Sequence, residues 1–191
     1  MSLHSRAMDK LMSDMFDDRT VIIGGELDRS VSTSVTSQLL LLNATDPDEG
    51  VKIYIDSAAG SVSAAFAICD MITWIKPEVS TLAIGAVGSV AAMVLCSGAK
   101  GKRYALPNSD VVLRLPGPEE GFAEEPVKPT AAAHERWGEE MVQLLAERTG
   151  QRPEAVAADL RNHHRLSAAA SVAYGIVDQV VVGGKFAPQS N

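Results

Sequence analysis

The chain lacks an excess of basic residues. Its 191 residues include 17 Lys and Arg against 24 Asp and Glu, which gives a net charge of −7. The longest basic cluster, Lys100–Arg103, is too short to form the extended basic surface with which proteins hold a phosphate backbone. The composition therefore argues against nucleic acid as a partner.

Cysteine is scarce as well. The chain holds only Cys69 and Cys96, and their spacing matches no metal-ligand motif. Both fall on helices that we expect to be buried, so we interpret them as reduced core thiols of a cytoplasmic protein. The sequence suggests no cofactor and no metal site.

Long uncharged runs are also rare. Residues 81–99 lack charge over nineteen positions, which by length alone would suggest a membrane span. Gly85, Gly88 and Gly98 interrupt this run, and it lies within a strand–turn–helix pattern, so a buried core segment is the better interpretation. The first residues include several aspartates and no apolar stretch, so we expect neither a signal peptide nor a membrane partner.

Hydrophobic residues make up 46% of the chain and charged residues 21%, which is typical of a globular protein of one domain. Strand and helix patterns alternate, which predicts an α/β fold of right-handed βαβ units with a largely parallel sheet. We expect an N-terminal arm or short helix over 1–19, a domain over 20–183 and a tail over 184–191. The predicted strands are 20–25, 51–56, 79–84, 103–106, 111–115 and 176–182, and the predicted helices are 31–42, 64–75, 90–97, 130–149, 153–160 and 167–174.

Ser89 occupies a notable place in this pattern. It follows an apolar strand and a predicted tight turn at Gly85–Gly88, and it begins a helix of small residues. A serine there could act as a nucleophile, because the N–H groups of the first helical turn lack intrahelical partners. Serine also caps many helices without any further role, so the position alone is a weak signal.

Three segments carry a more specific resemblance. The runs SGAKGKRYALPNS (97–109), RLSAAASVAYGIVDQVV (165–181) and IDSAAGSVSAAFAICDMI (55–72) resemble the proteolytic subunit of the Clp protease family. The resemblance implies the Clp/crotonase-type spiral of βαβ units as a single domain, with a protruding handle helix over 116–149. It also implies a serine endopeptidase built as two stacked rings, which a hexameric AAA+ ATPase feeds with unfolded polypeptides.

The resemblance assigns site positions residue by residue. The family's nucleophile falls on Ser89, and the backbone N–H groups of its oxyanion hole fall on Gly60 and Val90. The general-base histidine falls on Arg114, and the aspartate that orients it falls on His163. The family's Pro-Gly-Gly run before the oxyanion glycine reads Ala58-Ala59-Gly60 here.

These replacements remove the proton chemistry of the triad. A guanidinium stays protonated and has no lone pair to accept the proton of Ser89. Loss of a triad histidine costs on the order of 10⁶ in kcat, about 8 kcal/mol of barrier, whereas a nearby cation could return only a few kcal/mol. His163 as a relocated base remains an alternative. A metal site at His163 and His164 has less support, because adjacent histidines point apart, and polar surface or interface histidines are the interpretation we favour. We expect Arg114 to pair with a carboxylate such as Asp110, Glu119 or Glu120, or with the backbone of a substrate.

Other family features fall on recognisable positions. The apolar pocket that docks the ATPase includes Leu40, Tyr54 and Trp74, although ordinary core positions would give the same residue types. The segment 116–129 holds four prolines and four glutamates and occupies the place of the ring-to-ring handle.

The leading hypothesis is a Clp-type subunit that has lost catalysis and assembles with active paralogues into a mixed ring. One alternative is an active ATP-dependent serine endopeptidase with rearranged residues. A further alternative is a crotonase-like acyl-CoA enzyme, because that family shares the spiral fold and the two-amide oxyanion hole.

Overall fold

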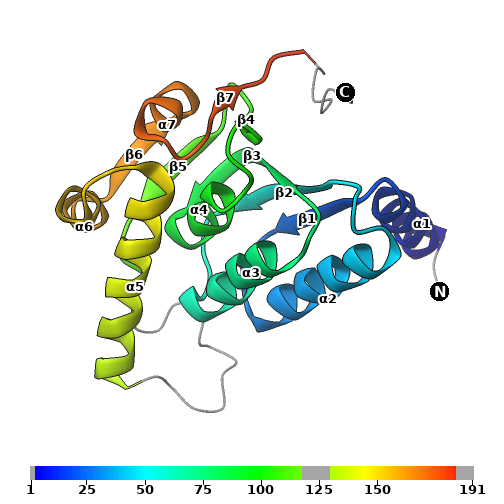
Figure 1. Ribbon diagram of the computed structural model, residues 1–191, viewed down its shortest axis with the longest axis horizontal. Coiled ribbons are helices and arrows are strands. Elements are labelled where there is room, and N and C mark those ends of the chain that lie inside the picture. The colour runs from blue at the N-terminus through cyan, green and yellow to red at the C-terminus, as the bar shows by residue number, and fades with distance from the viewer. Residues whose placement is uncertain (1–2, 118–129, 184–191) are drawn as a thin grey trace.

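The computed structural model describes residues 3–117 and 130–183 and shows one α/β domain (Figure 1). A mixed sheet of seven strands forms its centre, with the order β1-β2-β3-β4-β7, and β5 and β6 branch from β3. Helices α2, α3 and α4 lie side by side along the sheet, while α5, α6 and α7 gather around the end formed by β5 and β6 (Figure 1). The predicted fold class is confirmed.

The first half of the domain consists of βαβ units with parallel strand pairs. Strand β1 pairs with β2, and β2 pairs with β3, both in parallel. Asp28 begins α2 by accepting a hydrogen bond from Val31 N, which is the usual start of a helix at an acidic residue. The elements are α1 (Leu3–Asp17), β1 (Thr20–Gly24), α2 (Arg29–Thr45), β2 (Val51–Ser57), α3 (Val62–Trp74), β3 (Val79–Gly88) and α4 (Ser89–Cys96).

The second half adds short strands and three helices. Thr130 caps α5 at its start, and Gly150 ends it in the left-handed conformation at φ 78°, in agreement with the helix predicted over 130–149. Pro153 opens α6, and Ser167 caps α7, at the starts of the helices predicted over 153–160 and 167–174. The elements are β4 (Arg103–Ala105), β5 (Asp110–Leu113), α5 (Ala131–Thr149), α6 (Pro153–Arg161), β6 (His164–Ser167), α7 (Ala168–Tyr174) and β7 (Gln179–Val180).

The core lies between the sheet and its helices. Alternate strand residues such as Val21, Ile23, Ile53 and Ile55 are fully buried. All eight residues of α4 are buried, because this helix is enclosed by the sheet, α3 and α5. Small side chains make that close packing possible, so α4 places Ser89 inside the domain instead of at a surface helix end.

Two boundary predictions are wrong. Gly85–Gly88 does not form a tight turn, because β3 continues through it and Ala86, Val87 and Gly88 pair in parallel with β5. Gly85 takes φ +60°, in the left-handed region, where the register between β2 and β3 shifts, so β3 carries an irregularity there and then continues. The predicted strand over 176–182 is confined to Gln179–Val180.

Two further elements were absent from the sequence prediction or left open by it. Residues 164–167 form β6, which pairs antiparallel with β5. The N-terminal segment is a helix over Leu3–Asp17, whereas the sequence left an irregular arm or a short helix open. The tail over 184–191 and residues 118–129 of the predicted handle lie outside the described residues.

Both cysteines are buried and free, on α3 and α4. Burial raises the pKa of Cys69 to about 12 and also raises the pKa of Cys96, so both remain protonated and unreactive thiols. Within the described part of the chain, no helix has the length and apolar character that a membrane span requires.

Candidate active site

Ser89 lies at the junction of β3 and α4. Gly88 is the residue before the helix and has extended dihedral angles, φ −78° and ψ 171°, so the chain passes from strand to helix without an intervening loop. The exposed fraction of Ser89 is 3%. The predicted strand-to-helix position of the serine is therefore present, but its side chain is enclosed.

The hydroxyl of Ser89 is held by the backbone of β5 and the residue that follows it. Arg114 N donates to Ser89 Oγ at 2.5 Å, and the hydroxyl has carbonyl acceptors at Arg114 O (2.5 Å) and Val112 O (3.2 Å). In a parallel ladder, one residue donates to the residue before its partner and accepts from the residue after it. Ser89 Oγ makes this same pair of contacts, with Val112 and Arg114, and so extends the β3–β5 ladder where β3 becomes helix.

Gly60 lies on the segment between β2 and α3, beside Ser89. Its φ of +156° lies in a region that side chains rarely adopt. A Cβ on Gly60 would come within 2.5 Å of Leu27 O, because Leu27 pairs with this segment through Leu27 N to Ala59 O and Ser61 N to Leu27 O. The position therefore requires glycine, and Leu27 fixes the segment in place.

Gly88 lets residues 58–60 pack closely against the end of β3. A Cβ on Gly88 would lie within 2.5 Å of the backbone carbonyl oxygen of Ala58. The absence of a side chain at Gly88 thus allows residues 58–60 to approach the start of α4 closely.

Four of the expected site residues surround one small cavity, and His163 is not among its lining residues. Ser89, Gly60, Val90 and Arg114 all line it. Its volume of about 10 Å³ corresponds to about one water molecule. The structure therefore brings the four positions together, and the space between them is nearly closed.

The two positions that the resemblance assigns to the base and the orienting aspartate lie just outside the ends of two paired strands, β5 and β6. Arg114 follows β5 directly, and β6 starts at His164, which pairs with Leu113. His163 precedes β6, is exposed, and has a left-handed backbone at φ 54°. Among the described residues, no imidazole or carboxylate is hydrogen-bonded to Ser89 Oγ.

Of the carboxylates predicted as partners of Arg114, only Asp110 lies among the described residues. Asp110 accepts a hydrogen bond from Arg165 at 2.9 Å. Glu119 and Glu120 lie outside the described residues.

The positions expected for ATPase docking lie away from this cavity. Leu40 on α2 is 41% exposed and Trp74 at the end of α3 is 68% exposed. Tyr54 is half-buried on β2, where it pairs with the exposed Ile22 of β1. The interpretation of Leu40 and Trp74 as ordinary core residues is therefore wrong, and both are surface residues of this chain.

Sequence reasoning missed Leu27 and Val112, and it did not predict that Ala58 and Arg114 contribute through their backbones. Leu27 and Ala58 lie against Gly60 and Gly88, and the backbone groups of Val112 and Arg114 contact Ser89. Backbone contacts leave no residue-type signal, although the glycines at 60 and 88 mark places where two backbones approach closely.

Comparison with known families adds a final observation. Residues 4–184 match the family model described as Clp protease. The match includes the three resembling segments and every site position named above, and it favours this family over the acyl-CoA hydratases that share the fold. The chain therefore belongs to the Clp protease family.

Proposed function

We propose that this chain is a Clp-type proteolytic-subunit homologue without peptidase activity of its own. In this proposal it forms part of a cytoplasmic double ring with active paralogues and contributes chamber wall and docking surface. An AAA+ ATPase supplies unfolded polypeptide to that ring.

The observation that carries this proposal is the environment of the Ser89 hydroxyl. A serine nucleophile must pass its proton to a base as it attacks. Here the hydroxyl's described partners are the amide of Arg114 and the carbonyls of Val112 and Arg114. An amide cannot accept a proton and a carbonyl is a very weak base, so this arrangement keeps the hydroxyl protonated.

The side chain at position 114 supports the same conclusion. A guanidinium is charged at every working pH and cannot act as a base. It could stabilise negative charge near Gly60 and Val90, but this is worth only a few kcal/mol, against about 8 kcal/mol for the missing base. The net expectation is an inactive or severely impaired subunit.

A relocated Ser–His pair with His163 is the competing assignment. His163 is exposed and lies before β6, and no hydrogen bond joins it to Ser89. The geometry therefore gives this alternative no direct support, and a labelling experiment separates the two.

The test for activity uses the purified chain with a fluorogenic peptide, alone and mixed with an active paralogue. We expect no turnover by the lone chain and no reaction of Ser89 with a fluorophosphonate. Turnover or labelling that disappears in Ser89→Ala would refute the proposal. Loss of labelling in His163→Ala as well would identify the relocated pair.

The assembly is tested by size-exclusion chromatography. Ring-sized complexes that contain both chains are expected when this chain is mixed with an active paralogue. If the chain elutes as a monomer in every mixture, the assembly part of the proposal is wrong.

The docking part rests on the exposed apolar side chains. Leu40 and Trp74 are large, apolar and exposed, as the side chains of a docking surface would be. Trp74→Ser is expected to weaken co-purification of the ring with its AAA+ ATPase by at least about tenfold, as for an aromatic residue central to an interface. Val182→Ser is the control, because Val182 is likewise apolar and 74% exposed, but it follows β7 and is not one of the predicted docking positions. Equal binding by Trp74→Ser and the control would contradict this role.

A further inference from the structure

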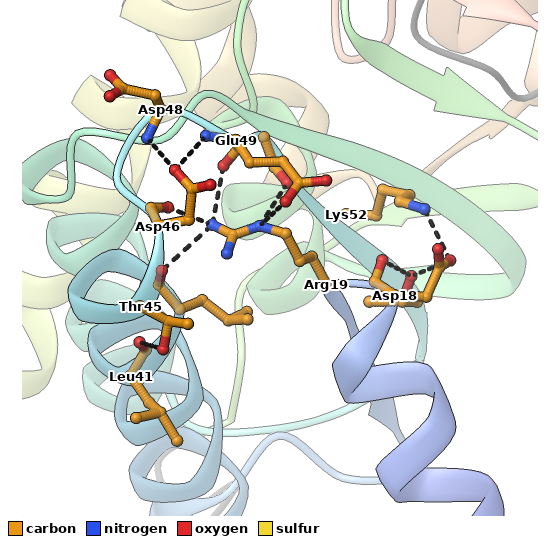
Figure 2. A network of polar contacts seen from close by, with 11 residues as sticks. Asp18, Arg19, Leu41, Thr45, Asp46, Asp48, Glu49 and Lys52 are labelled. Carbon is orange, nitrogen blue, oxygen red and sulfur yellow. Dashed lines mark hydrogen bonds and ion pairs between the residues drawn. The ribbon is translucent and has the colours of Figure 1, made fainter.

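Arg19 connects the N-terminal helix to the sheet in an unusual way. It is separated from the end of α1 by Asp18 alone and lies immediately before β1, and it is 6% exposed despite its charge. Its backbone is left-handed at φ 54°, a conformation that is uncommon for residues other than glycine. Figure 2 shows its guanidinium pointing away from α1 into the loop that follows α2.

The guanidinium organises that loop through carbonyl groups. Its Nη2 donates to Leu42 O (3.2 Å), Asp46 O (2.8 Å) and Glu49 O (2.8 Å), and its Nε donates to Gly50 O (3.1 Å). The last carbonyls of a helix lack intrahelical partners and carry partial negative charge, so a cation is favourable at the end of α2.

The backbone of Arg19 ties in two further elements. Arg19 N donates to Phe16 O at 2.9 Å, which closes the end of α1. Lys52 N donates to Arg19 O at 2.9 Å, which fixes the junction to the start of β2. One residue therefore joins the ends of α1 and α2, the loop Asp46–Gly50 and strand β2.

The loop depends on this residue because it has little other internal support. Asp46 Oδ1 accepts from Asp48 N (2.9 Å) and Glu49 N (3.3 Å), and an exposed ion pair joins Asp48 to Lys76. The ion pair between Glu49 and Arg19 is long, at 3.8 Å, and Glu49 is 67% exposed, so it adds little. The buried hydrogen bonds of the guanidinium are the stronger contacts (Figure 2).

We propose that Arg19 is a latch that couples the N-terminal helix to the loop Asp46–Gly50, so that neither can move alone. Release of the guanidinium opens the loop, and it also frees the left-handed junction from which α1 projects. Helix α1, which carries the exposed side chains Leu11 and Met12, is then a fixed part of the domain surface and not an independent arm. This inference does not depend on the proposed function.

The test is hydrogen–deuterium exchange on the full chain with Arg19→Gly. Glycine accepts the left-handed backbone, so this variant removes the guanidinium without adding strain. We expect exchange in residues 10–17 and 46–50 to rise together by about tenfold or more, since each charged hydrogen bond contributes on the order of one such factor. Exchange in the central strand β3 should stay unchanged.

Chemical rescue makes the assignment specific. Millimolar guanidinium ion should restore protection to both segments in Arg19→Gly, whereas sodium chloride at the same concentration should not. Lys52→Met is the matched control, because it removes only the exposed ion pair with Asp18 at the same junction.

Several exchange results would contradict the coupling between α1 and the loop. Opening of the loop with unchanged exchange in α1, or failure of guanidinium to restore either segment, would overturn the coupling. If Arg19→Gly does not fold, Arg19→Lys keeps the charge but loses the planar fork of donors and should show the same joint rise at smaller size. Unchanged exchange of both segments in Arg19→Lys would then overturn the proposal.

Discussion

The two sides of the Ser89 cavity differ in the groups that form them, which are backbone groups on one side and a side chain on the other. On one side, Gly60 and Val90 provide backbone groups from the loop after β2 and the start of α4. On the other side stands Arg114, at the position that the family resemblance gives to the general base, while His163 lies outside the cavity lining. The backbone side keeps its close packing, whereas among the described residues the side-chain side places no base in hydrogen-bond contact with Ser89.

The difference shows that the side-chain side of the cavity can change while the backbone side stays the same. Backbone geometry at Gly60 and Gly88 is fixed by contacts with Leu27 and Ala58, which also hold the fold together. The side chains at 114 and 163 are half-exposed or exposed, so the domain can change them without loss of core packing. Chemistry can therefore be lost while the surrounding scaffold stays intact.

The largest expected effect is on peptidase activity, and it comes from restoring side chains that can move a proton at positions 114 and 163. The double variant Arg114→His with His163→Asp places an imidazole and a carboxylate at the two triad positions. We expect peptidase kcat/KM to rise from background by on the order of 10³-fold or more, since the base is the major missing term. The measurement is fluorogenic peptide hydrolysis in the assembled ring.

Two controls define that result. Adding Ser89→Ala to the double variant should abolish the gained activity, and Arg114→Gln should gain nothing. If the double variant stays at background while it folds and assembles, the backbone side is also defective, and the contrast between the two sides would be wrong.

The next effect tests the backbone side. Gly60→Ala puts a Cβ within 2.5 Å of Leu27 O at a φ of +156°. We expect a loss of about 3–4 kcal/mol in the free energy of unfolding, from the combined steric and backbone strain. Gly25→Ala is the matched comparison, since φ is +77° but no atom lies within 4 Å, and its loss should be only about 1 kcal/mol. Equal losses in urea unfolding would show that packing against Leu27 is not what requires the glycine.

A somewhat smaller effect tests side chains that support the scaffold. Arg103 and Asp178 form a pair at 2.6 Å, with side chains 5% and 17% exposed, and Asp178 also accepts from the amides of Gly101 and Arg103. Asp178→Asn should lower the free energy of unfolding by about 2–3 kcal/mol, because it leaves a buried guanidinium without its counter-charge.

The same pair gives a pH dependence. Burial alone would raise the pKa of Asp178, but hydrogen bonds from Arg103 and from backbone amides hold it below its ordinary value of 3.8. The carboxylate therefore stabilises the fold above that value, and this contribution is lost as the pH falls through 3.8 towards the lower native pKa. The stability difference between the wild-type chain and Asp178→Asn should shrink over this range. A constant difference would contradict the assignment.

The smallest effect concerns an exposed pair. Lys52 and Asp18 lie 2.8 Å apart, but Asp18 is 74% exposed. Lys52→Met should change the free energy of unfolding by less than about 1 kcal/mol, and by less still at high salt. A larger change would show that this junction depends on the ion pair as well as on Arg19.

Much of the fold follows from local signals in the sequence. Thr130, Gly150, Pro153 and Ser167 mark helix ends through their side chains or backbone freedom, and each lies where the structure begins or ends a helix. Alternating apolar residues such as Ile53 and Ile55 identify strands whose one face is buried.

The errors arise where tertiary pairing overrides local signals. Glycines at 85 and 88 suggest a turn, but Ala86–Gly88 pair with β5, so β3 continues to Gly88. Residues 161–166 carry no predicted helix or strand, yet His164–Ser167 form β6 against β5. The partner of the Ser89 hydroxyl could not be predicted either, because it depends on the register between β3 and β5.

The structural role of the Ser89 hydroxyl affects how a serine at this position is interpreted in related sequences. As a hydrogen-bonding link between strand and helix, the hydroxyl is worth keeping even in a chain that cuts nothing, since its loss would remove the hydrogen bond from the Arg114 amide. A serine at this position is thus poor evidence of a working peptidase. Selection for architecture alone could preserve the residue long after catalysis has ceased.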